Sequence, residues 1–258
     1  MSEKVQKILD AMDFKSDTAL YCDYDGTLTP IVENPDDARL TDEQRDFITE
    51  VAGNDHITLL LISGRPISTL KELSRLDNIT WVGSHGYEIE HPDGTQDTTI
   101  DQSVWENMKD DLRVRFNELL DKYDGSAMEM KTGSFAFHYR QVESSKKQAT
   151  QEEALALVDS LSSKYDLNTI HGKEVIEIKP AGFDKGVALL KIREMLSTNE
   201  DNELYLGDDT TDKDAMEALP EKAINVWVGN KLPEEANYLV QSVDDIYELL
   251  REIHKKYS

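Results

Sequence analysis

The feature that most constrains the fold is an alternation of short apolar runs with helix-patterned stretches, which stops in mid-chain and later resumes. Residues 18–24 and 57–63 are short, apolar and bounded by turn residues, so they predict buried strands. Residues 41–54 between them have helical spacing, with Thr41 as the N-cap. A further helix that starts near Pro66 leads to a third strand at residues 79–83. Strands that alternate with helices predict a parallel sheet with right-handed crossovers.

The middle of the chain has a different order, in which each helix is followed by two strands. We predict helix 103–123, strands 126–131 and 134–141 joined around Gly133, helix 147–165, and a hairpin at 168–179 that turns at His171 and Gly172. This αββαββ order predicts a small, open antiparallel sheet with helices on one face.

After Pro180 the first pattern returns. We predict helices at 184–197, 211–218 and 243–256 and strands at 203–207 and 223–228. The expected fold class is therefore α/β, with a parallel-sheet core formed by residues 1–100 and 180–258. The core is interrupted by an inserted α+β cap at residues 101–179.

Charge and composition narrow the class of partner. The chain of 258 residues has 52 acidic against 28 basic side chains and a formal net charge of -24. A surface this acidic repels nucleic acid and anionic lipid, so we expect neither as a partner. The charge serves solubility or an adaptation to salt, and the sequence leaves both open.

Several features indicate a cytoplasmic protein. The sequence has no run of about 18 apolar residues, and its N-terminus lacks the apolar core of a signal peptide. Cys22 is the only cysteine, which fits a reducing compartment. We expect a cytoplasmic monomer that acts on a small molecule.

The strongest motif is the DYDGT segment at the end of the first predicted strand. Asp23 and Asp25 start on one side of that strand, and Gly26 lets the chain turn sharply. Two carboxylates there suit a nucleophile, Asp23, and an acid/base, Asp25. Backbone amides near Gly26 and the Thr27 hydroxyl can hold phosphate oxygens. The alternative is an ordinary turn rich in aspartate and glycine.

A second acidic cluster, GDDTTD, follows a later strand. Asp208, together with Asp23 and the backbone carbonyl of Asp25, suits a Mg²⁺ site, because Mg²⁺ prefers hard oxygen ligands. Asp209 and Asp212 would complete the shell or orient bound water. Helix capping explains one or two of these acids, and it leaves their pairing with the first cluster unexplained.

Two weaker motifs add groups that suit a phosphate. The Ser63 hydroxyl can bind a phosphate oxygen, and Gly64 permits close approach. The segment from Phe183 to Gly186 opens a helix, and its Lys185 can neutralise both phosphate and the Asp23 carboxylate. Each of these short motifs is weak by itself.

The order of the four motifs resembles the haloacid dehalogenase (HAD) superfamily of aspartate-nucleophile phosphatases, over essentially the whole chain. The resemblance implies a HAD-like Rossmannoid core with a type C2 cap and Mg²⁺ as cofactor. Asp23, Asp25, Thr27, Ser63 and Lys185 would then be catalytic.

Longer strings resemble the trehalose-6-phosphate phosphatase family. They are DYDGTLTPI from Asp23, GSHG from Gly83, MEMKTGSFAFHYR from Met128 and EIKP from Glu177. This likeness implies hydrolysis of trehalose 6-phosphate in trehalose biosynthesis, a cap that acts as a lid, and functional pairing with a trehalose-6-phosphate synthase.

Recognition of a disaccharide needs carboxylates and cations that can bind hydroxyls. Glu177 and Lys179 alternate with apolar residues on one strand and so share a face, whereas Phe135, Phe137 and Tyr139 have the parity of a packed face. We predict sugar contacts from Lys131, Arg140, Glu177 and Lys179 in the cap and from Gly64, Arg65, His85 and Gly86 in the core. Glu129 and His138 are weaker candidates, since strand alternation can turn one of them inward.

Two other interpretations remain open. Related enzymes act on sucrose 6-phosphate or on mannosyl- or glucosyl-3-phosphoglycerate, and they share the core while differing in the cap. A regulatory module without activity is the other alternative. The presence of Asp23, Asp25, Lys185 and Asp208 argues against it.

Overall fold

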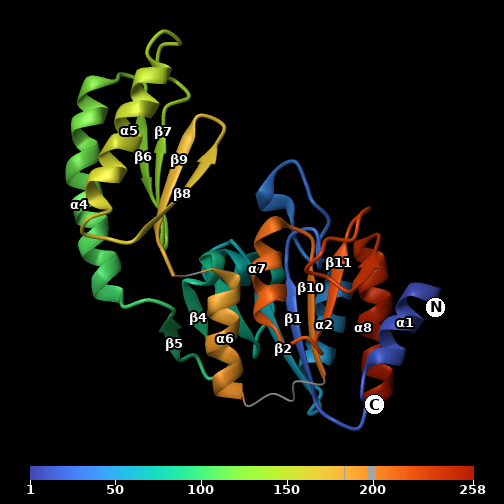
Figure 1. Ribbon diagram of the computed structural model, residues 1–258. Helices are drawn as coiled ribbons and strands as arrows, with labels where there is room; N and C mark the ends of the chain where they lie inside the picture. Colours follow the sequence, from blue (N-terminus) through green and yellow to red (C-terminus); the bar gives the residue numbers. More distant parts are fainter. Residues whose placement is uncertain (183, 197–201) are drawn as a thin grey trace. The chain divides into compact units, whose positions relative to one another are not determined.

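The computed structural model describes residues 1–182, 184–196 and 202–258 (Figure 1). The chain divides into two compact units, Met1–Thr99 with Phe183–Ser258, and Ile100–Gly182. These limits differ by one to three residues from the predicted ones, which place the core at 1–100 and 180–258. Phe183 and the predicted helix end at Ser197 lie outside the described residues.

The first unit, the core, is built on an eight-stranded sheet with strand order β12-β11-β10-β1-β2-β3-β4-β5. Its strands are β1 (Thr18–Asp23), β2 (Ile57–Ile62), β3 (Thr80–Gly83), β4 (Glu88–Glu90), β5 (Gln96–Thr98), β10 (Glu203–Gly207), β11 (Ile224–Val228) and β12 (Tyr238–Val240). All pairs from β12 to β3 are parallel, which confirms the predicted parallel core. The chain order reverses around β1, between β2 and β10, and ligands of open α/β sheets bind at such a point.

Helices cover both faces of this sheet. Successive strand residues point to opposite sides, so each buried strand supplies apolar side chains to both faces. On one face, Leu20 and Leu61 join the core cluster that includes buried residues of α1 (Glu3–Ala11), α2 (Asp42–Ala52), α3 (Ile67–Ser74) and α8 (Val243–Tyr257). On the other face, Tyr21 and Leu60 pack with α6 (Lys185–Leu196) and α7 (Thr210–Ala218). Short 3₁₀ turns form at η1 (Pro35–Asp37) and η2 (Ser84–Gly86).

Local sequence accounts for where these helices begin. Thr41 caps α2 as predicted: the Gln44 amide donates to Thr41 Oγ1 at 3.2 Å, and the Thr41 amide donates to Gln44 Oε1 at 2.9 Å. The helix predicted to start near Pro66 is α3, which begins at Ile67 with Pro66 as its N-cap. Helix α1 was not predicted, although its Val5 and Ile8 are fully buried.

The second unit, the cap, has the predicted αββαββ order. Its elements are α4 (Gln102–Lys122), β6 (Ala127–Met130), β7 (Phe135–His138), α5 (Lys147–Leu161), β8 (Leu167–Gly172) and β9 (Val175–Pro180). The strands form an antiparallel sheet of order β6-β7-β9-β8, and both helices lie on one side of it (Figure 1).

The apolar face of the cap sheet is packed as predicted. The Phe116 ring of α4 lies with its centroid 4.7 Å from that of Phe135 and 5.1 Å from that of Phe137. The second hairpin was predicted to turn at His171 and Gly172, but both residues still pair with β9. The turn falls at the next two residues, where Glu174 has a φ of 61°.

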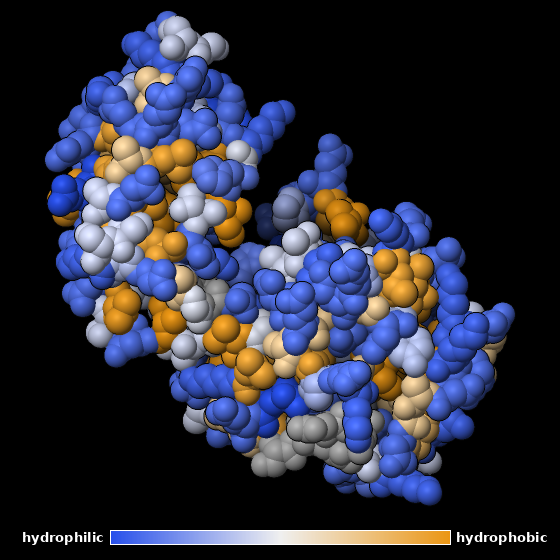
Figure 2. Space-filling view, viewed as in Figure 1, coloured by the Kyte–Doolittle hydropathy of each residue, from blue (hydrophilic) through white to orange (hydrophobic). Residues whose placement is uncertain are grey.

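The surface matches the composition. Figure 2 shows mainly hydrophilic side chains, with apolar residues in small separate groups. Among the helices of the described residues, none is both long and apolar enough to cross a membrane.

Candidate active site

The loop after β1 places two carboxylates at the carboxyl end of the central strand. Asp23 ends β1 and is 4 % exposed, whereas Asp25 reaches the surface. Gly26 has a φ of 84°, and its amide donates to the Thr29 carbonyl at 2.7 Å. A Cβ at this position would lie 2.1 Å from Oδ2 of Asp208. Glycine is therefore needed both for the turn and for the approach of the second acidic cluster.

Lys185, at the start of α6, joins the two acidic clusters in the interior. Its Nζ lies 2.6 Å from Asp23 Oδ1 and 2.6 Å from Asp212 Oδ1. Burial by itself lowers the pKa of Lys185, but the two carboxylates more than offset this and raise it. Burial raises the pKa of Asp23, while Lys185 acts in the opposite direction.

Asp212 was predicted near the metal, and the structure shows its oxygens already bound by four donors. Oδ1 accepts from Lys185 and from the Tyr205 hydroxyl at 2.7 Å, and Oδ2 accepts from the amides of Asp208 at 3.0 Å and Asp209 at 2.9 Å. Sequence reasoning missed Tyr205. The signal was a tyrosine in an otherwise apolar buried strand, where its hydroxyl requires a partner.

The acidic residues bring together a group that can hold a cation. Asp23, Asp208 and Asp212 each offer a carboxylate oxygen, and these oxygens lie within 4.8 Å of one another. Asp208 Oδ1 is buried without a hydrogen-bond partner. Burial, reinforced by Asp212 and Asp209, raises the pKa of Asp208 to about 7. A cation would bind Asp208 Oδ1 and would offset the negative charge of the three carboxylates. These residues therefore fit a metal with hard oxygen ligands.

The other predicted metal residues are placed differently. Asp209 is exposed and caps α7, where its side chain accepts from the Thr210 amide at 2.7 Å. Asp25 was predicted to bind the metal through its backbone carbonyl, and its carboxylate binds an arginine.

That arginine is Arg65, which was predicted to contact the substrate. Its Nε donates to Asp25 Oδ2 at 2.6 Å and its Nη2 to Asp25 Oδ1 at 2.6 Å. Nη2 also donates to the Pro35 carbonyl at 2.9 Å. Ser63 is buried beside it, and its Oγ accepts from the Arg65 amide at 3.2 Å.

The turn after β3 holds His85 in a left-handed conformation, with a φ of 56°. Glu88 stabilises this turn, since its Oε2 accepts from the Ser84 hydroxyl at 2.8 Å. A Cβ at Gly64 would lie 2.4 Å from the His85 ring, so Gly64 makes room for that ring. Gly86 was predicted as a substrate contact, but it is buried, and a Cβ there would lie 2.3 Å from the Asp184 carbonyl oxygen.

A cavity of about 290 Å³ opens at these strand ends. It is lined by Asp23, Asp25, Ser63, Gly64, Arg65, His85, Lys185, Asp209 and Thr211. Sequence reasoning did not single out Thr211, although it belongs to the second acidic motif. Thr27 is fully buried, and its Oγ1 has no hydrogen-bond partner among the described residues.

The open face of the cap sheet carries the predicted polar residues. Lys131 Nζ lies 3.0 Å from Glu177 Oε2, and the Ser134 hydroxyl, which sequence reasoning missed, donates to Glu177 Oε1 at 2.6 Å. Glu129 and His138 face the same side and lie 3.1 Å apart, so neither turns inward as the alternation argument suggested. Lys179 is half-buried on β9, with the same parity as Glu177.

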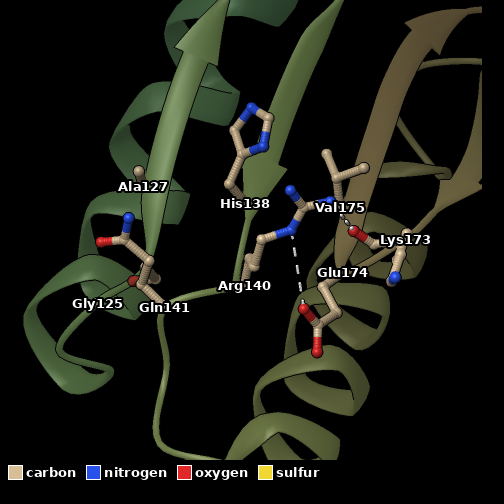
Figure 3. A pocket seen from close by; sticks show the side chains of 9 residues that line it. Gly125, Ala127, His138, Arg140, Gln141, Lys173, Glu174 and Val175 are labelled. Carbon is tan, nitrogen blue, oxygen red and sulfur yellow. Dashed lines mark hydrogen bonds and ion pairs between the residues drawn. The ribbon is translucent and has the colours of Figure 1, made fainter.

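A second cavity, of about 500 Å³, lies at one end of the cap sheet (Figure 3). Arg140 reaches across it toward the β8–β9 turn, with Nε 3.9 Å from Glu174 and Nη2 3.4 Å from the Lys173 carbonyl (Figure 3). His138 also lines this cavity, so the structure groups the predicted Arg140 with Lys173 and Glu174, which sequence reasoning had not selected.

A parallel-sheet core with an inserted cap is also the fold of a haloacid dehalogenase-like hydrolase from Bacteroides thetaiotaomicron, which superposes with a TM-score of 0.64 at 18% identity and covers 92% of this chain. Comparison with known proteins narrows the class. The family description Trehalose-phosphatase matches residues 21–242. Trehalose 6-phosphate phosphatase RA3 of Zea mays is 31% identical over 258 aligned residues, covering 92% of this chain and 70% of that protein. The chain belongs to the trehalose-phosphatase family.

Two further matches concern the fold and a longer relative. The structure of Aspergillus fumigatus trehalose-6-phosphate phosphatase superposes with a TM-score of 0.74 at 23% identity and covers 97% of both chains. The UDP-forming alpha,alpha-trehalose-phosphate synthase B of Dictyostelium discoideum is 29% identical over 96% of this chain. The chain spans only 32% of that synthase.

Proposed function

We propose that this chain hydrolyses trehalose 6-phosphate to trehalose and phosphate, with Mg²⁺ as cofactor and a phospho-aspartate at Asp23 as intermediate. The observation that carries the proposal is the placement of Asp23 at the end of the central strand. Its Oδ1 lies 2.6 Å from Lys185 Nζ, and its carboxylate belongs to the same cluster of three carboxylates as that of Asp208. Family membership supports the sugar phosphate as substrate.

In the first half-reaction an Asp23 carboxylate oxygen attacks phosphorus. The bond between phosphorus and the sugar oxygen breaks, and its electron pair stays with that oxygen, which takes a proton from Asp25. In the second half-reaction water attacks the phosphorus, Asp25 takes the water proton, and Asp23 leaves as a carboxylate. Asp25 lines the same cavity as Asp23 and can serve as acid and then as base.

The other groups of the core would stabilise charge. Asp23, Asp208 and the backbone carbonyl of Asp25 are the proposed Mg²⁺ ligands. Asp212 would lie behind them, because its oxygens are already bound by Lys185, Tyr205 and two amides. When bound, Mg²⁺ supplies Lewis-acid stabilisation of charge on the phosphoryl group, and such terms are worth several kcal/mol. Ser63 and Lys185 would bind phosphate oxygens, and the buried Thr27 hydroxyl would position the loop.

The cap would supply the groups that recognise the sugar. Its open face presents Lys131, Glu177 and Lys179, together with the pair formed by Glu129 and His138. Carboxylates and ammonium groups on a sheet are suited to bind several hydroxyls at once. Arg140 and the core residue His85 are further proposed contacts.

We also propose that the protein is a cytoplasmic monomer without a nucleic-acid partner, in keeping with its net charge of -24 and single cysteine. A functional pairing with a trehalose-6-phosphate synthase is motivated by the Dictyostelium relative, a synthase whose sequence includes a region like this chain.

Phosphate release from a panel of esters, with and without Mg²⁺, tests the proposal. The panel holds trehalose 6-phosphate, sucrose 6-phosphate, glucose 6-phosphate and mannosyl-3-phosphoglycerate. We expect Mg²⁺-dependent release, with the highest kcat/KM for trehalose 6-phosphate. Preference for another ester would overturn the assigned substrate. In that case Glu177→Gln shows whether the cap face recognises the sugar, because it should raise KM for the preferred ester and leave KM for the other esters unchanged.

A further inference from the structure

We propose that Arg65 is a positioning residue that holds the Asp25 side chain in place to accept the water proton in the second half-reaction. This inference deepens the proposed function and rests on the acid/base role of Asp25. It replaces the predicted role of Arg65 as a direct substrate contact.

The geometry is that of a two-pronged ion pair. Nε and Nη2 of Arg65 each donate to a different Asp25 oxygen, both at 2.6 Å. Such paired, charge-assisted bonds are short and fix the plane of the carboxylate as well as its position. The Asp25 side chain is 36% exposed, and among the described residues Arg65 is the one charged partner that holds it.

Arg65 is itself anchored to the framework. Nη2 also donates to the Pro35 carbonyl at 2.9 Å, and the Arg65 amide donates to Ser63 Oγ at 3.2 Å. Its side chain is only 15% exposed. The guanidinium thus connects the end of β2, the η1 turn and Asp25, three segments that meet only in the folded core.

This arrangement fixes the orientation of the Asp25 side chain. Both of its oxygens accept from Arg65 N–H groups, so the carboxylate cannot rotate without breaking a charge-assisted hydrogen bond. The carboxylate retains lone pairs that can accept a proton from water, as hydrolysis of the phospho-aspartate requires.

Pre-steady-state kinetics with p-nitrophenyl phosphate and saturating Mg²⁺ separate the two half-reactions. Nitrophenolate is a stable anion and leaves without a proton, so its release does not need Asp25 as an acid. In Arg65→Gln we expect a burst of nitrophenolate close to one equivalent of enzyme. A steady state slowed about 100-fold should follow, because misplacing a catalytic group by about 1 Å costs that much.

Matched variants make the result decisive. Asp25→Asn should give the same burst and a slowed steady state. Arg65→Lys should have a steady-state rate between those of the parent and Arg65→Gln. Added guanidinium should partly restore turnover in Arg65→Ala. Arg45→Gln is the control, because Arg45 also binds aspartates, Asp46 at 2.6 Å and Asp42 at 3.0 Å, but on the surface of α2. It should behave like the parent.

The outcomes separate the two levels of the argument. If Asp25→Asn gives a burst and Arg65→Gln gives a slowed burst with a raised KM, Arg65 binds the phosphate and the inference is wrong. If Arg65→Gln keeps parent kinetics, the inference is also wrong. If Asp25→Asn itself gives no burst, the proposed role of Asp25 fails. Arg65→Lys and guanidinium rescue decide the question if Arg65→Gln does not fold.

Discussion

Replacing Gly26 by alanine should damage metal binding far more than it damages the fold. Two effects act at this position. The φ of 84° is left-handed, which costs a non-glycine residue about 1–2 kcal/mol. In addition, the new Cβ would lie 2.1 Å from Asp208 Oδ2, and a side chain cannot remain at that distance. The Asp208 carboxylate must leave its present position beside Asp23 and Asp212.

Gly94→Ala separates these effects. Gly94 has a φ of 83°, and a Cβ there meets nothing within 4 Å, so the substitution produces only the backbone strain. Both variants should lose about 1–2 kcal/mol in the free energy of unfolding, less the gain from restricting the unfolded chain. Gly26→Ala alone should require a higher Mg²⁺ concentration for half-maximal activity, by about 10- to 100-fold, which is the loss typical of disturbed metal ligation.

The assays are urea denaturation without metal and phosphate release as a function of Mg²⁺ concentration. If Gly26→Ala has the Mg²⁺ activation constant of Gly94→Ala, Asp208 does not hold the metal at this position. A loss of stability in Gly26→Ala with no change in Mg²⁺ activation would refute the link between Gly26, Asp208 and the cation.

Three further predictions follow from the buried ion network. Measured by urea denaturation, Tyr205→Phe should lower the free energy of unfolding by about 1.5–3 kcal/mol, because it removes a hydrogen bond to the charged Asp212. Tyr247→Phe is the control: it loses a hydrogen bond to a neutral carbonyl and should lower the free energy of unfolding by about 1 kcal/mol. Lys185→Met should cost about 3–5 kcal/mol, because it leaves buried carboxylates without their cation, and a cost below 1 kcal/mol would contradict their ionised state. Because the pKa of Asp208 is raised to about 7, its carboxyl is protonated below that pH, and protons compete with the metal there. Titration calorimetry should show Mg²⁺ affinity falling up to about tenfold per pH unit below 7, and Asp208→Asn should abolish that part of the pH dependence.

Much of the fold could be predicted because the signals are local. The apolar runs of β1 and β2 and the Thr41 cap depend on neighbouring residues alone. The antiparallel β4 and β5 were missed, because each has three residues and little apolar content. The turn of the second cap hairpin was misplaced by two residues, since Gly172 is the expected turn residue and the left-handed residue is Glu174.

The site was predictable to the level of residue types and not to the level of partners. Motif spacing places Asp23 and Asp208 at neighbouring strand ends, and the sheet order brings them together. The partner of Arg65 could not be predicted, because Asp25 lies 40 positions away and the bond depends on how two loops meet. The same holds for Tyr205 and Asp212, whose contact needs the register between a strand end and the first turn of α7.

The most direct test of the account is to trap the phosphoryl group on the enzyme. Asp25→Asn, mixed with p-nitrophenyl phosphate and Mg²⁺ and then quenched in acid, should carry one phosphoryl group on the peptide that contains Asp23, as seen by mass spectrometry, because nitrophenolate leaves without a proton from Asp25. Adding Asp23→Asn to that variant should remove the label. Phosphate release by the parent with no covalent phosphoryl in the trapped variant, or a phosphoryl group on another residue, would contradict Asp23 as the nucleophile.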